Sequence, residues 1–245
     1  MKQRFKATLT YNGSNYHGWA KQPGQETIQG VLENTINNVL NQKVKVYAAG
    51  RTDAGVNAVG QVIHFDLEIN IKPKQIKEAL NKALPYDIRI AKIQKVSSKF
   101  NARFDAKSKT YIYYINTNTI NDAVKSSHIY QYNKPINISL VKKTNKVFLG
   151  QHNFLSFSTD ERSEEALERK ILSIKVKKQK DIVSIAVSGT GFLRSQIRMM
   201  VGAMLALNEN KITLLQIKQW LNEPKKGQAV YKAPACGLCL VKVRY

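Results

Sequence analysis

The chain has 245 residues and is 43% apolar, which suits one large domain or two modest ones and excludes a disordered chain. Its 39 lysines and arginines against 17 aspartates and glutamates give a formal charge of +22, which favours RNA, DNA or an anionic membrane surface as partner. A general bias toward lysine would explain only part of this excess. Neither a signal-peptide core nor an apolar window of about 18 residues is present, so we expect a cytoplasmic protein that does not cross a membrane.

The first part of the chain alternates strand and helix patterns. Residues 4–11 alternate apolar and polar side chains, as a half-buried strand does, and Thr27 is placed to cap a helix that begins at Ile28. A second helix is predicted after Pro73, because proline fits the first turn of a helix. Further strands are predicted over residues 44–48, 61–67 and 87–96.

The later part of the chain opens with an irregular basic segment, residues 100–109, and a tyrosine-rich strand, residues 110–115. Residues 116–139 show little periodicity, which predicts a long connection. Ser139 is predicted to cap a short helix, and a longer helix is predicted to begin near Phe192. A last helix is predicted over residues 214–221, and strands over residues 171–176, 182–187 and 238–245.

This mixture of strands and helices predicts an α+β fold with mixed, mostly antiparallel sheets and flanking helices. We expect two similar halves around a central basic cleft. The N-terminal half would be residues 1–105 and the C-terminal half residues 106–245.

The sequence suggests neither a metal nor a cofactor. Walker A, HExxH and GxSxG motifs are absent, and the four histidines are scattered. Gly189 and Gly191 match the first two glycines of the dinucleotide-binding motif GxGxxG, but Arg194 occupies the position of the third glycine. Cys236 and Cys239 are read as residues of the last strand, where residues three apart face opposite ways, so a disulfide between them is not expected.

The segment Gly50–Val56, GRTDAGV, is the first candidate site. An aspartate in a loop most often bonds its own backbone, and composition alone favours that structural interpretation for Asp53. The functional interpretation is a catalytic or RNA-facing carboxylate beside Arg51 on a loop held by rigid strands.

Aromatic and cationic side chains supply two more candidates. Tyr111 and Tyr113 share one face of a strand, which fits core packing or a platform for base stacking. Arg194 and Arg198 border the apolar stripe of the Phe192 helix. Either could be a cation at the core edge or one that reaches a carboxylate, and periodicity does not choose between the two arginines.

Taken in order, these segments resemble the TruA family of tRNA pseudouridine synthases over most of the chain. The match departs from the usual family residues at Ala20, Asn57 and Asn101. The segments that carry it are residues 11–19, 50–56, 100–104, 109–113, 150–154, 191–193 with Arg198 and residues 201–202, 233–238 and 243–245.

The resemblance implies the pseudouridine synthase fold and the isomerisation of uridine to pseudouridine at positions 38, 39 and 40 of the tRNA anticodon stem-loop. It implies that Asp53 is the nucleophile, that Tyr111 stacks on the uracil and that Arg198 pairs with the aspartate. Arg51 would fill the gap left by the displaced nucleotide, and Thr52 would contact the substrate. No cofactor or metal is implied, and the family is usually a homodimer.

Three alternatives remain at this point. A non-catalytic RNA-binding protein on the same scaffold would explain the charge and the aromatic residues equally well. A pseudouridine synthase of another family, acting on a different RNA, would share the aspartate but not the full series of motifs. A membrane-surface protein is disfavoured, because no basic amphipathic anchor helix is evident.

Overall fold

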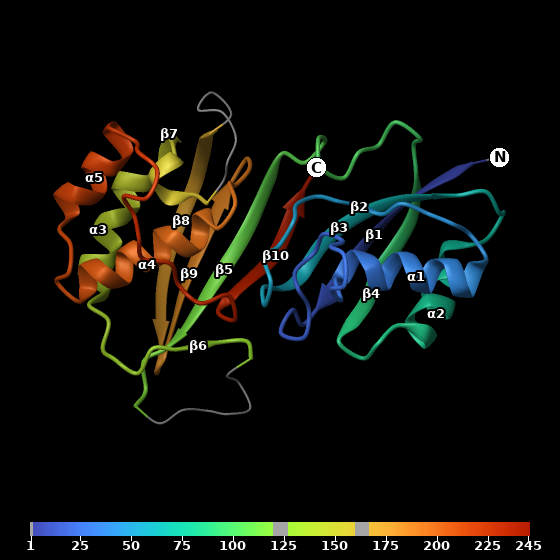
Figure 1. The fold of residues 1–245 in the computed structure, drawn as a ribbon, viewed down its shortest axis with the longest axis horizontal. Coiled ribbons are helices and arrows are strands. Elements are labelled where there is room, and N and C mark those ends of the chain that lie inside the picture. The colour runs from blue at the N-terminus through green and yellow to red at the C-terminus, as the bar shows by residue number, and fades with distance from the viewer. Residues whose placement is uncertain (1, 120–126, 160–166) are drawn as a thin grey trace. The chain divides into compact units, whose positions relative to one another are not determined.

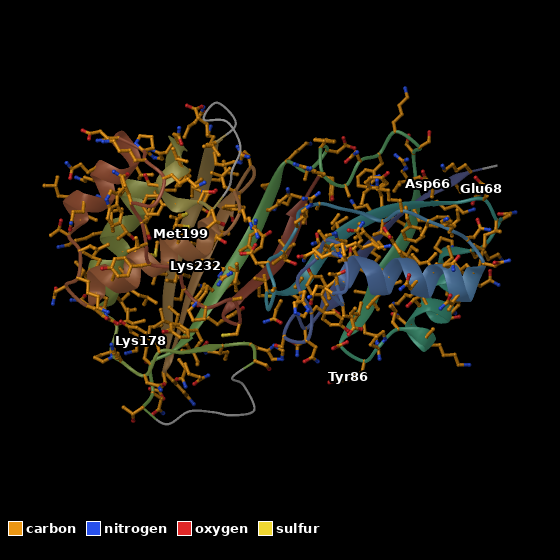
Figure 2. The ribbon with its side chains drawn as sticks, viewed as in Figure 1. Asp66, Glu68, Tyr86, Lys178, Met199 and Lys232 are labelled. Atoms are coloured by element: carbon orange, nitrogen blue, oxygen red, sulfur yellow. The ribbon has the colours of Figure 1, made fainter. Side chains whose placement is uncertain are left out.

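The computed structural model describes residues 2–119, 127–159 and 167–245, and the chain divides into two compact units (Figure 1). The first unit contains Met1–Lys107 together with Leu240–Tyr245, and the second contains Ser108–Cys239. Charged side chains lie at the surface of each, as Glu68 and Lys178 do in Figure 2. None of the helices in the described ranges has the length and apolar character needed to cross a membrane.

The first unit is built on antiparallel strands covered by two helices. Its strand order is β4-β1-β3-β10, and the short β2 also pairs with β3. Helices α1 and α2 pack against each other, and α2 packs against β4 (Figure 1). The elements are β1 (Gln3–Tyr11), α1 (Ile28–Leu40), β2 (Tyr47–Ala48), β3 (Asn57–Leu67), α2 (Pro73–Ala83), β4 (Ile88–Val96) and β10 (Leu238–Arg244).

The core of this unit follows the predicted alternation. Every second residue of β1 from Phe5 to Tyr11 is buried. Apolar side chains of α1 and α2 at helical spacing are buried as well. The Thr27 side chain accepts a hydrogen bond from the Gly30 N–H at 3.3 Å, which confirms the predicted cap of α1.

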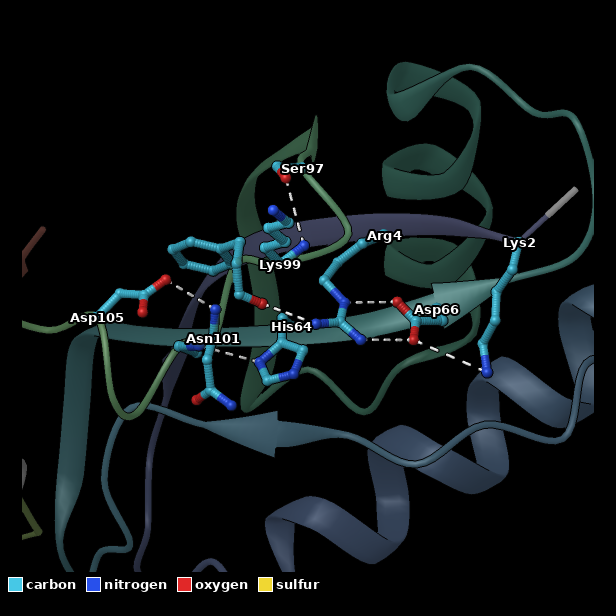
Figure 3. A network of polar contacts seen from close by, with 10 residues as sticks. Lys2, Arg4, His64, Asp66, Ser97, Lys99, Asn101 and Asp105 are labelled. Atoms are coloured by element: carbon cyan, nitrogen blue, oxygen red, sulfur yellow. Dashed lines mark hydrogen bonds and ion pairs between the residues drawn. The ribbon is translucent and has the colours of Figure 1, made fainter.

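A polar network on the first unit holds residues 97–105 against the strands (Figure 3). Arg4 donates two hydrogen bonds to Asp66, at 2.7 and 2.8 Å, and this guanidinium keeps the pKa of the Asp66 carboxyl below its usual range. Arg4 also donates to the Phe100 carbonyl oxygen at 2.9 Å. The buried His64 ring accepts the Ala102 N–H at Nδ1, 3.0 Å away. The irregular segment is therefore fixed by side chains of β1 and β3.

The second unit is built on mostly antiparallel strands that pack with helices. Its strands run in the order β5-β9-β8-β7, and the short β6 pairs in parallel with β5. Helix α3 packs against β8, α4 and α5, and α4 is buried along most of its length (Figure 1). The elements are β5 (Ser108–Asn116), β6 (Tyr130–Gln131), α3 (Ile138–Phe148), β7 (Gly150–Asn153), a short 3₁₀ helix (Leu155–Phe157), β8 (Glu168–Gln179), β9 (Ile182–Gly189), α4 (Gln196–Asn208) and α5 (Leu214–Asn222).

The α+β class with mostly antiparallel strands is confirmed, and the errors lie at element ends and in the short strands β6 and β7, which were not predicted. Asn137, not Ser139, caps α3, because its side chain accepts the Leu140 N–H at 3.0 Å. Helix α4 begins at Gln196 and not near Phe192. The preceding Ser195 has φ +61°, a left-handed conformation that a right-handed helix excludes.

The strand predicted over residues 44–48 is shorter in the structure, where β2 spans only Tyr47–Ala48. The Val46 N–H donates to the Glu33 side chain at 2.9 Å and its carbonyl accepts from Gln29 at 3.2 Å, so its backbone is satisfied by α1 and not by a strand.

Three further sequence-based expectations have a structural outcome. The connection over residues 116–139 contains β6, and its residues 120–126 lie outside the described residues. Cys239 lies in β10 as expected, but Cys236 lies in the turn before it, and no disulfide bridges these two described residues. The terminal Leu240–Tyr245, assigned above to the C-terminal half, packs with the first unit.

Candidate catalytic site

The loop that carries Asp53 lies in the first unit, between β2 and β3, and its main chain closes on itself. The Val56 N–H donates to the Asp53 carbonyl oxygen at 3.2 Å. Gly55 has φ +75°, which glycine adopts without steric cost. Just before the loop, the Ala49 N–H donates to the Val62 carbonyl oxygen at 2.7 Å. Asp53 is thus presented on a short turn that is bonded to β3 at one end and leads into β3 at the other.

Two buried polar side chains hold the loop to the strands beneath it. The Tyr11 hydroxyl on β1 is 2.9 Å from Thr52 Oγ1, and Gln61 on β3 donates to the Gly50 carbonyl oxygen at 2.8 Å. Gln61 also lies 3.4 Å from the Tyr11 hydroxyl. A buried polar group without a partner costs about 1–3 kcal/mol, so these bonds strongly favour one position of the loop.

The glycines of the tract after β1 allow that tract to pack directly on the loop. A Cβ on Gly18 would lie 2.8 Å from the Thr52 carbonyl oxygen, and Gly18 has φ +86°. The Trp19 N–H donates to the same carbonyl oxygen at 3.0 Å. A Cβ on Gly13 would lie 2.1 Å from the Val56 carbonyl oxygen. Residues 11–19 and 50–56 therefore form one structural unit, although the sequence separates them.

Two of the departures from the usual family residues have local structural roles. Asn57 is buried, and its side-chain oxygen accepts the Gly13 N–H at 2.9 Å. The Asn101 side-chain oxygen accepts the N–H groups of Arg103 and Phe104, at 2.9 and 3.2 Å. Both asparagines therefore stabilise turns of the first unit.

The three side chains at the head of the loop differ in exposure. Arg51 is exposed, Thr52 is buried and Asp53 is half-buried. The Thr52 hydroxyl is engaged with Tyr11, so it holds the loop in place. A half-buried carboxylate on a fixed turn, next to an exposed guanidinium, suits a nucleophile that acts on a polyanionic substrate.

In the second unit, the two tyrosines of β5 have different surroundings. Tyr113 is fully buried, donates to the Pro234 carbonyl oxygen at 2.7 Å, and its pKa is raised by burial, so it is a core residue. Tyr111 contacts Phe192 edge to face, with ring centroids 5.4 Å apart. Tyr111 is also buried, at 7% exposed, and its ring is held in place by Phe192.

The structure separates the two candidate arginines. Arg194 is exposed and precedes α4, whereas Arg198 lies in the first turns of α4 and is half-buried. Arg198 Nε donates to the Ala233 carbonyl oxygen at 2.8 Å, and the Ala233 N–H donates back to the Arg198 carbonyl oxygen at 3.0 Å. This reciprocal pair of hydrogen bonds fixes the direction of the Arg198 side chain. Within the described residues, the Arg194 side chain makes no such hydrogen bond to residues 231–234.

Each predicted site residue therefore has a defined local setting. Arg51, Thr52 and Asp53 share one loop of the first unit, and Tyr111 and Arg198 lie on β5 and α4 of the second. The described residues contain no group of three or more histidine, cysteine, aspartate or glutamate side chains that could hold a metal ion. Burial raises the pKa of the Cys236 thiol, which disfavours the thiolate that a cysteine nucleophile needs.

Sequence reasoning missed the residues that position the loop. Gln61 was interpreted only as the start of a strand, and Tyr11 as part of an alternating pattern and of the segment 11–19, without a role in holding the loop. A usable signal was present at Gln61, because a glutamine at a position that the alternation of β3 buries must find a hydrogen-bond partner.

Comparison with known proteins assigns the family. A family model described as tRNA pseudouridine synthase matches residues 7–105 and 145–245. The chain is 40% identical to tRNA pseudouridine synthase A of Malacoplasma penetrans, over 98% of this chain and 99% of that protein. It is 36% identical to the enzyme of that name from Mycoplasma genitalium, over 99% and 98% of the two chains, and 35% identical to that of a Geobacillus species, over 100% and 99%. The chain therefore belongs to the tRNA pseudouridine synthase family.

Proposed function

We propose that this protein isomerises uridine to pseudouridine at positions 38, 39 and 40 of the tRNA anticodon stem-loop, with Asp53 as the nucleophile. Family membership supports an isomerase that acts on tRNA. The observation that carries the choice of nucleophile is the Asp53 loop, which buried side chains and close backbone approaches support on several sides.

The reaction moves one glycosidic bond and leaves the atomic composition unchanged. The N1–C1′ bond of uridine breaks, the uracil turns, and a C5–C1′ bond forms. The hydrogen at C5 leaves as a proton and N1 gains one. A carboxylate serves this reaction as a covalent nucleophile, at the sugar C1′ or at the base C6, and is regenerated when the product forms.

The other predicted residues support this step in different ways. From the family resemblance, Arg198 would pair with the Asp53 carboxylate during the reaction. Tyr111 would stack on the uracil, and Arg51 would replace it in the RNA, which together offset the few kcal/mol needed to unstack a base. Thr52 would act mainly as a positioning residue, because its hydroxyl is bonded to Tyr11.

Tritium release from tRNA labelled at uracil C5 tests the proposal, because bond formation at C5 expels that hydrogen. Asp53→Ala and Asp53→Asn should reduce release at least ~10³-fold, as loss of a covalent nucleophile does. Both variants should still bind tRNA in a filter assay. Asp105→Asn is the matched control: Asp105 is exposed in the same unit, accepts the Asn101 N–H at 2.9 Å, and asparagine keeps that acceptor.

Each alternative has its own outcome in this assay. If wild-type protein binds tRNA but releases no tritium, a non-catalytic RNA-binding protein or a different RNA substrate is favoured. If Asp53→Asn unfolds the protein, the aspartate is a turn residue. If it retains activity, the nucleophile lies elsewhere.

We also propose, from the family resemblance, that the protein is a homodimer in the cytoplasm. Sedimentation equilibrium at micromolar concentration should give twice the mass of the chain. A monomer at that concentration would remove the dimer from the proposal and leave the assignment of the reaction intact.

A further inference from the structure

The second unit contains a surface pocket of about 150 Å³ to which the proposed reaction assigns no role. The pocket lies between β6, the C-terminal half of α4 and the segment that precedes β10. Its aromatic and charged lining residues are Tyr130, Tyr132, Glu209, Lys211, Tyr231 and Lys232. Figure 2 shows Lys232 in this segment, beside α4.

The charges of the pocket leave it positive. Glu209 is satisfied within the protein: it pairs with Lys211 at 2.6 Å and Lys134 at 3.1 Å and accepts the Tyr132 hydroxyl at 2.7 Å. Lys232 is exposed, and no carboxylate in the described ranges pairs with it. One acidic and two basic side chains, Glu209 with Lys211 and Lys232, therefore line the pocket, and the unpaired cation favours an anionic ligand.

The aromatic side chains give the pocket flat apolar faces with polar edges. Tyr130 and Tyr132 pack with ring centroids 5.9 Å apart at 53°. Burial raises the pKa of both, to about 12 for Tyr132, so their hydroxyls stay protonated at neutral pH. The Tyr231 side chain is half-buried and makes no hydrogen bond or ring contact with the described part of the chain. Such a ring is free to stack on a planar ligand.

One wall of the pocket is the segment that positions Arg198. A Cβ on Gly202 of α4 would lie 2.3 Å from the Tyr231 carbonyl oxygen, so this segment packs directly on the helix. Two residues later, Ala233 exchanges hydrogen bonds with Arg198, and Pro234 accepts the Tyr113 hydroxyl. A ligand against Tyr231 therefore lies on the segment that supplies Ala233, the hydrogen-bond partner of the Arg198 side chain.

We propose that this pocket binds an unpaired nucleotide of the RNA substrate other than the reacting uridine, with its base on Tyr231 and its phosphate on Lys232. The proposal rests on tRNA being the substrate. Stacking and an unpaired cation together fit a nucleotide, because aromatic rings accept any base and the ammonium binds the phosphate as a point charge. Bound RNA would then steady the segment that holds Arg198.

Filter binding of tRNA to full-length protein carrying Asp53→Ala tests the pocket without turnover. In this background Tyr231→Ala should weaken tRNA binding about 10-fold, from the loss of one stacked base, and Tyr231→Phe should keep most of the affinity. Lys232→Ala should lower the slope of log affinity against log salt by about 0.7–1, as expected for one lost phosphate contact. Lys218→Ala, an exposed lysine on α5, is the matched control and should change neither quantity.

Photo-crosslinking supplies an independent readout. Transcribed tRNA that contains 4-thiouridine should crosslink to the peptide around Tyr231, and Tyr231→Ala should remove that crosslink. Unchanged affinity and an unchanged salt slope in Tyr231→Ala and Lys232→Ala would overturn the proposal. If Tyr231→Ala also lowers the melting temperature, its weaker binding could reflect unfolding, and the salt dependence of Lys232→Ala then tests the proposal. Lys232 is exposed, so its replacement should leave the fold intact. Tritium release by wild-type protein is measured separately. Release together with unchanged tRNA binding in the pocket variants would overturn the pocket proposal and leave the proposed reaction intact.

Discussion

Asp53 in the first unit lies on an irregular turn, whereas Tyr111 and Arg198 in the second unit lie on a regular strand and helix. The turn depends on close backbone approaches at Gly13 and Gly18 and on two buried polar side chains beneath it. The strand and helix depend on packing, and Arg198 is additionally bonded to a single segment. The comparison teaches that the nucleophile loop has little tolerance for added volume, while the second region should respond mainly to changes in particular side chains.

The largest effect is expected from adding one methyl group at the Asp53 loop. Gly18→Ala places a Cβ 2.8 Å from the Thr52 carbonyl oxygen, and Gly18 has φ +86°. The clash and the left-handed strain together should lower the free energy of unfolding by about 3 kcal/mol or more and remove most activity. Thermal unfolding and tritium release measure both.

Gly24→Ala is the matched control for that variant. Gly24 has φ +69° but no atom within 4 Å of an added Cβ, so it carries the strain without the clash. We expect a loss of about 1 kcal/mol. Equal losses in the two variants would show that the close packing of Gly18 on the loop contributes nothing to stability.

The next largest effect should separate the two arginines of the second unit. Arg198→Ala should reduce kcat about 10²-fold, in the range for removal of one preorganised donor, while Arg194→Ala should stay within a few-fold of wild type. Arg198→Lys should not restore the rate, because lysine lacks the Nε–H that donates to Ala233. Single-turnover kinetics at saturating tRNA measure these rates, and comparable losses in both alanine variants would contradict the assignment.

A smaller effect is expected from one buried hydroxyl beneath the loop. Tyr11→Phe removes the 2.9 Å contact with Thr52 and should cost about 1 kcal/mol of stability. Activity should fall further than this stability loss explains if the contact positions Asp53. Tyr245→Phe, which loses a 2.8 Å hydrogen bond to the Ala102 carbonyl oxygen elsewhere in the same unit, should destabilise similarly with little change in kcat.

The smallest effect is a difference in acid sensitivity between the units. Burial lowers the pKa of His64, whose neutral Nδ1 accepts the Ala102 N–H. The unfolded chain then binds more protons, so stability of the first unit should fall as pH drops below about 6.5. In the second unit, hydrogen bonds from Lys211 and Tyr132 lower the pKa of Glu209 to about 2 from 4.5, so its contribution should persist above pH 4.5 and disappear toward pH 2.

Hydrogen exchange measured by mass spectrometry resolves the two units in this experiment. Between pH 7 and pH 5, after correction for intrinsic exchange, peptides around Ala102 should lose protection and those around Tyr132 should not. His64→Gln should reduce the pH dependence of the first group. Parallel loss in both groups would refute separate acid responses.

The errors made from sequence share a physical origin. The starts of β2 and α4 were misplaced, because the bond from the Val46 N–H to the Glu33 side chain and the left-handed residue Ser195 override local propensity. Asn137 replaced Ser139 as the cap of α3, since neighbouring polar residues compete for the same helix end. Element interiors were predicted better, because apolar periodicity extends over many residues.

The sequence by itself determined the α+β class, the basic character and the GRTDAGV loop with Asp53, because periodicity, charge and an ordered set of motifs are properties of the chain alone. Only the tertiary structure decided that Tyr11, Gln61 and the glycines at 13 and 18 hold that loop, and that Arg198 is supported by Ala233. Most of these contacts join residues about 34 to 50 positions apart, and the shortest, from Gln61 to Gly50, spans 11. No local pattern encodes such pairs, because they form only when distant segments are packed together.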